Sequence, residues 1–391
     1  MINNRKNGIV TMRVTCAIFF VFFTFLYLYD YQADIMSVIQ HVLSQGATHY
    51  NRLIGAVLIT VVLWLLQFTI YSFIRLERVG HALSYFPSLL LLAILTDVTR
   101  DVDTESYIGC WAWLFPLLMI VYAVVIWFCR QMESLDSSPF VTESSSRLLW
   151  QNLAIMGAMM LMTCSIGCSD EVFHYRMRME NDLSNQRYED AQQVGINEEK
   201  TDSSLTFLRV WALAGTHQLG ERLFEYPLVG GSDAMLPNGS SVKVMMASTK
   251  PVYKMLGVYF KQQMRPRVYF EKLHQKWWAT KESNDWLLCA YLLDCDVDAF
   301  AHNITKYYRL DSHLPKHYRE ALILYTHLRE HPYLVYHDAV MDADYEDYQD
   351  MSKKYANLKV RYSQLKDAYG KTYWFYFFTH RRVANRMKSG R

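Results

Sequence analysis

The sequence predicts an all-α protein, with an N-terminal bundle of about five transmembrane helices followed by an irregular helical-repeat soluble domain. Residues 1–168 contain long apolar runs and few charges, whereas residues 169–391 hold 31 of the 40 Lys and Arg and 28 of the 38 Asp and Glu. In the second part apolar residues recur three and four positions apart, the period of a helix, and rarely alternate as in a strand. The chain of 391 residues is long enough for two such units.

Five segments of the first part are apolar enough to be considered as spans, since a helix needs about 20 apolar residues to cross a bilayer core of about 30 Å. They are Val14–Tyr29, Leu53–Ile74, Val79–Thr96, Ser106–Cys129 and Leu148–Ser169. The first segment is followed by LYLYDYQAD, which has no cleavage site with small residues. We therefore interpret it as a retained anchor rather than a signal peptide.

The distribution of basic residues predicts the orientation of this bundle. With the N-terminus inside, the cytoplasmic segments hold seven Lys and Arg and the outer loops hold two, Arg52 and Arg100. Such an excess is typical of the cytoplasmic side of a bacterial membrane. Five crossings then place everything after Cys168 outside the cytoplasm. The domains we predict are 1–168 in the membrane, 169–370 as an extracytoplasmic helical-repeat domain, and 371–391 as an aromatic and basic C-terminal segment.

The outer loops of the bundle are acidic, and one of them contains an amphipathic pattern. DIMSVIQHVL places Ile35, Val38, Ile39, Val42 and Leu43 at helical spacing, which indicates a helix lying on the outer surface. Exclusion of Lys and Arg from outer loops is enough to explain their acidity. As an alternative, an outer carboxylate near the bilayer would suit a membrane glycosyltransferase acting on a lipid-linked substrate. The candidate catalytic residues under that alternative are Asp30, Asp34, Asp101 and Asp103.

The second part predicts many short helices in succession. We expect them near 170–182, 185–195, 203–225, 251–262, 266–279, 282–294, 297–309, 316–330 and 341–370, with a Gly- and Pro-containing loop at 226–241. LTFLRVWALAGTHQLGERLFEYP, at 205–227, resembles a tetratricopeptide-type hairpin, because Ala212, Ala214 and Gly215 would let two helices approach closely. No strict 34-residue period is present, so we predict an irregular solenoid.

The usual signatures of enzymes and metal sites are absent from the sequence. It contains no Gly-rich phosphate loop, HExxH, GxSxG or CxxC. MDADYEDYQD resembles the start of a calcium loop, but Asp347 stands where Gly is needed and Lys353 where Glu is needed. No histidine pair has helical metal-site spacing together with a third ligand. We therefore predict no metal and no cofactor, and the near-neutral net charge argues against nucleic-acid binding.

Two aromatic clusters leave alternatives open. KWWATKESNDW gathers Trp277, Trp278 and Trp286, which predict core packing or, if the rings are exposed, a peptide or sugar groove. The C-terminal TYWFYFFTHRRVANRMK is too short in its apolar part to cross a bilayer. It predicts a last helix that packs on the solenoid or, alternatively, docks on the lipid surface.

The stretches LTFLRVWALAGTHQLGERLFEYP and AYLLDCDVDAFAHNITKYYRLDSHLPKHYREALILY carry a family resemblance, with LPKHYREAL the most specific part. The chain resembles an uncharacterised domain-of-unknown-function family of bacterial polytopic membrane proteins with a tetratricopeptide-like outer domain. The resemblance implies a location in the inner membrane of a double-membraned bacterium, and it supplies no catalytic residues.

Together these observations favour a binding role over an enzymatic one. We expect an inner-membrane protein that contacts lipid and binds a protein or peptide in the periplasm through its helical solenoid, whose concave surface suits such a ligand. The membrane enzyme is the alternative. Transport is a third and weaker possibility, because the spans hold no buried acid or base other than His81.

Overall fold

The computed structural model describes residues 2–76, 80–100, 102, 109–135, 145–260, 262–311 and 313–389. Over these residues the regular structure is helical, with eighteen α-helices, four short 3₁₀ or π segments and no strand. The chain forms two compact units, unit 1 at Met1–Met177 and unit 2 at Arg178–Arg391. The division falls inside one helix, α7 (Glu171–Ser184).

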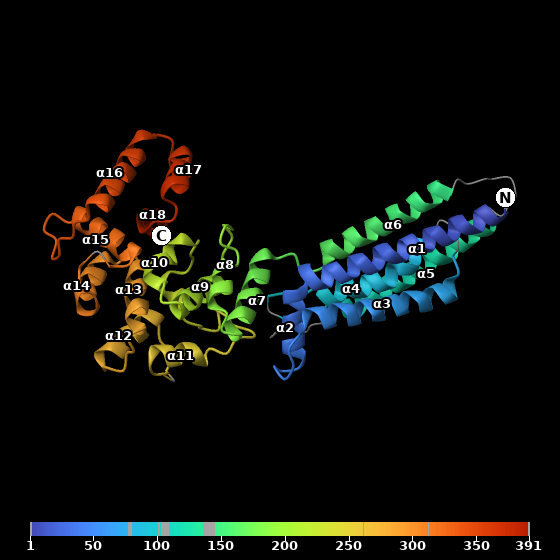
Figure 1. The fold of residues 1–391 in the computed structure, drawn as a ribbon, viewed down its shortest axis with the longest axis horizontal. Coiled ribbons are helices and arrows are strands. Elements are labelled where there is room, and N and C mark those ends of the chain that lie inside the picture. Colours follow the sequence, from blue (N-terminus) through green and yellow to red (C-terminus); the bar gives the residue numbers. More distant parts are fainter. Residues whose placement is uncertain are drawn as a thin grey trace. The chain divides into compact units, whose positions relative to one another are not determined.

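Unit 1 is a bundle of long apolar helices (Figure 1). Its elements are α1 (Ile2–Leu26), η1 (Tyr27–Tyr31), α2 (Ala33–Leu43), α3 (Arg52–Ile74), η2 (His81–Tyr85), α4 (Phe86–Thr96), α5 (Trp111–Leu135) and α6 (Ser145–Ile166). Four stretches are long and apolar enough to cross a membrane, namely Gly8–Tyr31, Arg52–Ile74, Trp111–Gln131 and Ser146–Ile166. The remaining predicted span, Val79–Thr96, corresponds to a shorter apolar helix at His81–Thr96.

This shorter helix, formed by η2 and α4, runs parallel to α1 and α6. Near its start, the backbone N–H of Ala82 donates to Asn152 of α6 (2.9 Å), whose Nδ2 lies 3.1 Å from the sulfur of Met12 in α1. At its end, the hydroxyl of Thr96 lies 3.1 Å from that of Tyr27. The short helix therefore lies alongside α1 from Met12 to Tyr27.

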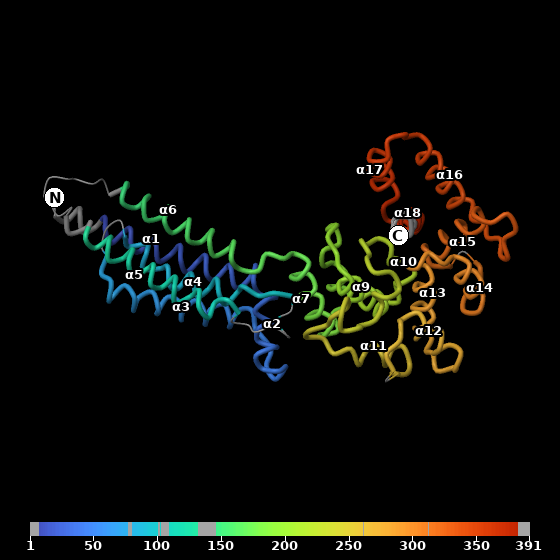
Figure 2. Tube along the Cα trace, turned by 180° about the vertical axis from the view of Figure 1, so that it is seen from behind, coloured from blue at the N-terminus to red at the C-terminus, as the bar shows by residue number. Residues whose placement is uncertain are grey.

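Its contacts with α3 and α5 run in the opposite sense. Gln67 of α3 donates to Ser84 (3.0 Å). Ser88, four residues after Ser84, donates to the carbonyl of Leu63, which lies four residues before Gln67. On α5 the indole of Trp111 donates to Asp97 at one end (2.7 Å), while Tyr122 contacts the segment before α4. The chain thus reverses direction at each step from α1 to α3, α4, α5 and α6, and Figures 1 and 2 show these helices side by side.

The amphipathic segment predicted after the first span forms α2. Its apolar side chains Ile35, Val38 and Ile39 are buried, whereas Leu43 at its end is exposed. Asp34 in the first turn is also buried and accepts a hydrogen bond from Arg52 (2.7 Å). The helix dipole stabilises a negative charge near the helix N-terminus, so the Asp34 carboxylate is favourable in the first turn of α2.

Unit 2 is a succession of shorter helices. After α7 they are α8 (Tyr188–Gln193), α9 (Ser203–Gly215), α10 (Leu219–Arg222), η3 (Leu223–Glu225), η4 (Gly231–Met235), α11 (Lys250–Leu256), α12 (Pro266–Gln275), α13 (Ser283–Leu293), α14 (Val297–Tyr307), α15 (Lys316–Leu328), α16 (Ala339–Lys354), α17 (Leu358–Tyr369) and α18 (Tyr373–Ser389). Consecutive helices pack on one another from α12 through α17. In α9, Gly215 lies against the ring of Tyr188 in α8, so this small residue allows close approach of the helix that precedes the 205–227 stretch rather than of a helix within it.

Two predicted helices of unit 2 are each broken. The helix expected at 203–225 ends at Gly215, because His217 adopts a left-handed backbone (φ +58°) and a new short helix starts at Leu219. The helix expected at 341–370 is divided into α16 and α17, and the side chain of Asn357 caps the second one by accepting from Lys359 N (2.9 Å). Helical periodicity continues through both breaks, so the pattern alone does not reveal them.

The C-terminal aromatic run contributes to the core of unit 2. Tyr373, Trp374 and Phe377 of α18 are almost fully buried, and α18 packs against α15 and α17. The indole of Trp374 donates to the backbone carbonyl of Glu320 in α15 (2.8 Å). These rings therefore face protein. The side chains of the basic residues from Arg382 onward lie outside the described part.

Candidate ligand-binding pocket

The three tryptophans singled out in the sequence occupy different environments. Trp286 lies in α13 and has no exposed surface. Trp278 is 46% exposed and Trp277 is 92% exposed, just after α12 ends. Core packing thus describes Trp286, and the two adjacent rings are available on the surface of unit 2.

The segment that follows α11 lies directly beside the segment that contains Trp278. Thr280 donates its backbone N–H to the carbonyl of Leu256 (3.4 Å), and its hydroxyl donates to the carbonyl of Met255. Gly257, the first residue after α11, has φ +126°, and a Cβ there would lie 2.2 Å from the carbonyl oxygen of Trp278. Only glycine fits this backbone and this approach, so Gly257 holds the two segments together.

A continuous series of aromatic contacts connects the surface with the core. The ring centroids of Trp278 and Phe260 are 5.8 Å apart, and those of Phe260 and Tyr269 are 5.4 Å apart at 84°. From Tyr269 the series passes to Phe270 (5.6 Å) and then to Trp286 (5.9 Å). Two of these pairs, Phe260–Tyr269 and Tyr269–Phe270, are edge-to-face, an arrangement that adds about 0.5–1.5 kcal/mol beyond burial.

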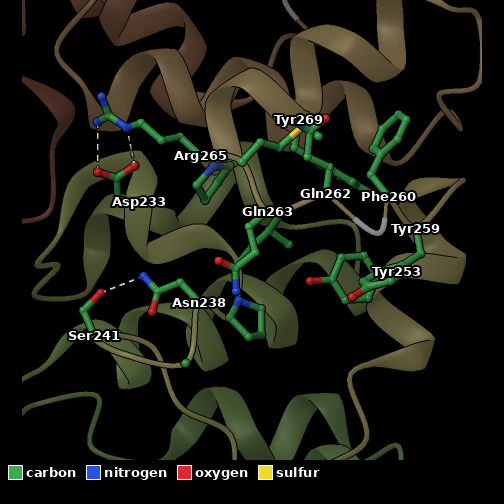
Figure 3. Close-up of a pocket in the computed structure, with 15 residues that line it drawn as sticks. Asp233, Asn238, Ser241, Tyr253, Tyr259, Phe260, Gln262, Gln263, Arg265 and Tyr269 are labelled. Carbon is green, nitrogen blue, oxygen red and sulfur yellow. Dashed lines mark hydrogen bonds and ion pairs between the residues drawn. The ribbon is translucent and has the colours of Figure 1, made fainter.

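Phe260 and Tyr269 of this series, together with Tyr253 and Tyr259, form an aromatic wall on one side of a pocket of about 670 Å³ in unit 2 (Figure 3). Its lining residues come from the loop 233–241, from the end of α11 and from the segment that leads into α12. They are Asp233, Leu236, Pro237, Asn238, Gly239, Ser241, Tyr253, Tyr259, Phe260, Gln262, Gln263, Met264, Arg265, Pro266 and Tyr269. The volume falls within the range of about 300–1,000 Å³ that is typical of ligand sites.

Charged and amide groups complete the opposite side of the pocket. Arg265 donates two hydrogen bonds to the carboxylate of Asp233 (3.0 and 2.9 Å), in the fork geometry that Figure 3 shows. The side chain of Asn238 accepts from the backbone of Ser240 and Val242, which fixes the shape of the loop. Figure 3 shows Gln263 reaching into the space beside Asn238.

The side-chain amides of Gln262 and Gln263 have no hydrogen-bond partner among the residues that the structure describes. Each amide offers two donor hydrogens and one acceptor oxygen. The hydroxyl of Tyr253 likewise has no such partner there, and its side chain also lines the pocket. The pocket thus combines an apolar aromatic wall with the solvent-exposed amides of Gln262 and Gln263.

An ionic network fixes the frame around this pocket. Arg267 at the start of α12 pairs with Asp296 (2.7 Å) and Glu271 (3.1 Å), and more weakly with Asp294 (3.4 Å). Asp294 in turn accepts from both the backbone and the hydroxyl of Ser232 beside η4 (3.0 and 2.9 Å). Partial burial alone would lower the pKa of Arg267, but its hydrogen bonds to Asp296 and Glu271 outweigh this effect and raise that pKa.

The acidic residues proposed for an enzyme lie in unit 1. Asp30 is exposed in the π-helical turn η1, and the carboxylate of Asp34 is paired with Arg52. Asp101 and Asp103 lie outside the described residues. Within the described residues, no group of three or more His, Cys, Asp or Glu could hold a metal ion.

The sequence does not predict the pocket. Its pattern predicts a loop at 226–241 and a single helix at 251–262, whereas α11 ends at Leu256. The signal that would have revealed the break is Gly257 followed by the exposed Val258 and Tyr259, with Pro266 at the start of the next helix.

Comparison with known proteins adds one result. No curated protein and no solved structure matches the chain. Residues 258–380, which run from the aromatic wall of the pocket into α18, match the model of DUF6057, a family of unknown function.

Proposed function

We propose that this chain is a multi-pass protein of the bacterial inner membrane that holds a binding domain, unit 2, in the periplasm. In this proposal the bundle of unit 1 crosses the bilayer five times, with the N-terminus in the cytoplasm. The four long apolar stretches and the alternating directions of the five helices support this arrangement. The ratio of seven basic residues inside to two outside supports the orientation.

The shorter apolar helix at His81–Thr96 is also compatible with crossing the bilayer. At 1.5 Å per residue the sixteen residues of His81–Thr96 are about 24 Å long, somewhat less than a bilayer core of about 30 Å. Leu89, Leu90 and Leu92 have no exposed surface, so protein covers most of this helix, whereas Leu91 is 37% exposed. A helix enclosed by longer neighbours does not need to match the lipid thickness itself.

We further propose that unit 2 binds a peptide or an exposed segment of a protein partner, and the pocket is the observation that carries this proposal. A peptide presents alternating N–H and C=O groups, which the amides of Gln262 and Gln263 are able to pair. Its apolar side chains fit against rings such as Tyr253 and Phe260. The consecutive packing of α12 to α17 supports an irregular, tetratricopeptide-like repeat as the surrounding scaffold.

Site-specific photocrosslinking in the full-length membrane protein tests this proposal. A photoreactive phenylalanine analogue replaces Tyr259 at the pocket, and in a matched control it replaces Tyr333, which is 68% exposed elsewhere on unit 2. We expect a defined polypeptide to be crosslinked from Tyr259 and not from Tyr333. Adding Gln263→Ala and Tyr253→Ala should reduce its yield at least fivefold.

Two outcomes would overturn the proposal. The first is that both positions capture the same polypeptides, since such capture reflects abundance rather than the pocket. The second is that the yield from Tyr259 does not change when Gln263 and Tyr253 are both replaced. The enzymatic alternative gains no support from the described geometry, because the Asp34 carboxylate is already engaged by Arg52.

A further inference from the structure

Trp277 occupies a backbone position that normally belongs to glycine. At the end of α12 the N–H of Trp278 bonds to the carbonyl of Leu273 (3.0 Å), and the N–H of Trp277 bonds to that of His274 (3.3 Å). This is the Schellman arrangement, whose residue after the C-cap is left-handed and usually Gly. Trp277 has φ +58° there, a conformation that costs about 1–2 kcal/mol for a residue with a Cβ.

This strained tryptophan contributes nothing to the core, because it is 92% exposed. It is also not isolated. Tyr259 is 61% exposed and Val258 is 39% exposed, and the contact between Gly257 and Trp278 places their segment beside Trp277. We call the surface formed by Val258, Tyr259, Trp277 and Trp278 the Trp277 surface. Exposed apolar groups gathered in this way mark a surface that meets another phase or molecule.

Three lysines lie in the segments that form the Trp277 surface. The segments 253–260 and 276–281 contain Lys254, Lys276 and Lys281, and Glu282 directly follows the second segment. The ammonium of Lys276 lies 4.8 Å from the ring centroid of Trp278. Lysine side chains keep their apolar stems beside such rings while the charged ends stay in water.

We propose that the Trp277 surface docks on the lipid–water interface of the anionic bilayer that holds the spans of this same chain. Trp and Tyr are enriched at that interface, because an apolar ring with one polar edge suits its composition. Each Lys near an anionic surface adds about 1 kcal/mol of attraction. The spans already hold unit 2 at the membrane, which gives a high effective concentration of the surface.

This docking shares Tyr259 with the pocket, but it is argued from Trp277, Trp278 and the lysines, none of which lines the pocket. A protein ligand would account for an apolar surface, but three lysines beside exposed tryptophans match anionic lipid more closely. The aromatic run of α18, the other candidate for lipid contact, has its rings in the core. The Trp277 surface, rather than α18, therefore combines exposed aromatic rings with lysine side chains.

Fluorescence quenching by brominated lipids tests the docking with the full chain. One copy is reconstituted per nanodisc that contains phosphatidylcholine and phosphatidylglycerol, with or without lipids brominated near the headgroup end of the acyl chain. The emission of Trp277 is obtained by subtracting the emission of the Trp277→Phe variant from that of the wild type. Phe keeps an aromatic side chain at this position. We expect bromination to lower this difference at least twofold.

Trp286→Phe provides the matched control, since Trp286 is fully buried and its difference signal should not respond to bromination. Replacing Lys254, Lys276 and Lys281 with Gln should relieve the quenching of Trp277. A Trp277 signal that is equal in the two kinds of nanodisc overturns the proposal.

Discussion

The Nδ1 atom of His317 lies 2.8 Å from Oε2 of Glu320, one turn further along α15, and neither side chain is accessible to solvent. The same carboxylate oxygen accepts the backbone N–H of Tyr373 in α18 (2.7 Å). The other ring nitrogen of His317 accepts the N–H of Phe224 (3.2 Å), so the proton of the neutral ring is on Nδ1. The distinctive LPKHYREAL stretch thus joins three separate parts of unit 2.

Glu320→Ala should weaken unit 2 substantially. The change leaves the N–H of Tyr373 and the Nδ1–H of His317 buried without an acceptor, and each unsatisfied buried donor costs about 1–3 kcal/mol. Hydrogen exchange of the α15 and α18 amides should then accelerate more than 100-fold. Asp350→Ala, at a carboxylate that is 79% exposed, serves as the control and should change exchange little. Equal exchange in the two variants would contradict the role of this pair.

Gly167→Ala should disturb the end of the bundle where α1, α4 and α6 meet. A Cβ at Gly167 would lie 2.2 Å from the hydroxyl oxygen of Tyr27 and 2.7 Å from that of Thr96. Overpacking of this kind costs about 1–3 kcal/mol. Thermal unfolding in detergent should show a lower midpoint, partly restored by Tyr27→Phe. In α6 a Cβ at Gly157 meets nothing within 4 Å, so Gly157→Ala should leave the midpoint unchanged or slightly raised.

Trp277→Gly should stabilise unit 2 while removing the lipid contact that we propose for this ring. Glycine adopts the left-handed backbone without strain, so the free energy of unfolding should rise by up to about 1 kcal/mol. Urea unfolding of the detergent-solubilised chain measures this change. Gly257→Ala serves as the opposite control and should lower the free energy of unfolding, because its Cβ would clash with the Trp278 carbonyl oxygen. A lower stability for Trp277→Gly would show that the exposed ring contributes to the fold.

Asp285 should make stability depend on pH. Burial raises the pKa of its carboxyl, and hydrogen bonds from the hydroxyls of Tyr308 and Tyr318 offset part of that rise. Because the folded chain holds this proton more tightly than the unfolded chain does, the contribution is stabilising below the unfolded pKa of about 3.9. It is lost as the pH rises through the raised folded pKa.

The comparison of wild type with Asp285→Asn isolates this titration. The difference between their free energies of unfolding should shift in favour of Asn as the pH rises from about 4 to the folded pKa, and should then stay constant. Urea titrations at several pH values measure it. Asp350→Asn should give no such trend, and a flat difference for Asp285→Asn would show that the raised pKa does not act on folding.

Arg265→Ala should affect binding more than stability. The ion pair between Arg265 and Asp233 is exposed, at 72% and 45%, and such pairs stabilise a protein by about 0–1 kcal/mol. The crosslinking yield from Tyr259 should fall, since one side of the pocket loses its fork of donors. Arg329→Ala, which removes a similar exposed pair with Asp298 elsewhere on unit 2, is the matched control. Equal crosslinking yields for Arg265→Ala and Arg329→Ala would show that Arg265 does not contribute to binding at the pocket.

The long helices of unit 1 were predictable because twenty apolar residues in succession have few other structures available. The short helix at His81–Thr96 was predicted as a full span, since the apolar run continues into Val79, and composition alone does not show where the helix begins. In unit 2 the breaks at His217 and Tyr355 depend on single backbone conformations, and helical spacing on both sides hides them.

The pocket shows the limit of sequence reasoning more clearly. Trp277, Trp278 and Trp286 are neighbours in sequence, yet only tertiary packing decides that Trp286 is buried and Trp277 is exposed. Asp233 and Arg265 are separated by thirty-two positions and meet because the network around Arg267 fixes their segments. Such pairings depend on which helices pack together, and no local pattern encodes that choice.

The burial of Tyr373, Trp374 and Phe377 in the core of unit 2 has a consequence for biogenesis. The helices α15 and α17, on which α18 packs, are synthesised before these rings, so their shared core is completed only once α18 has been made. Premature termination before Tyr373 should therefore produce a species that proteases remove, even though every preceding helix is encoded.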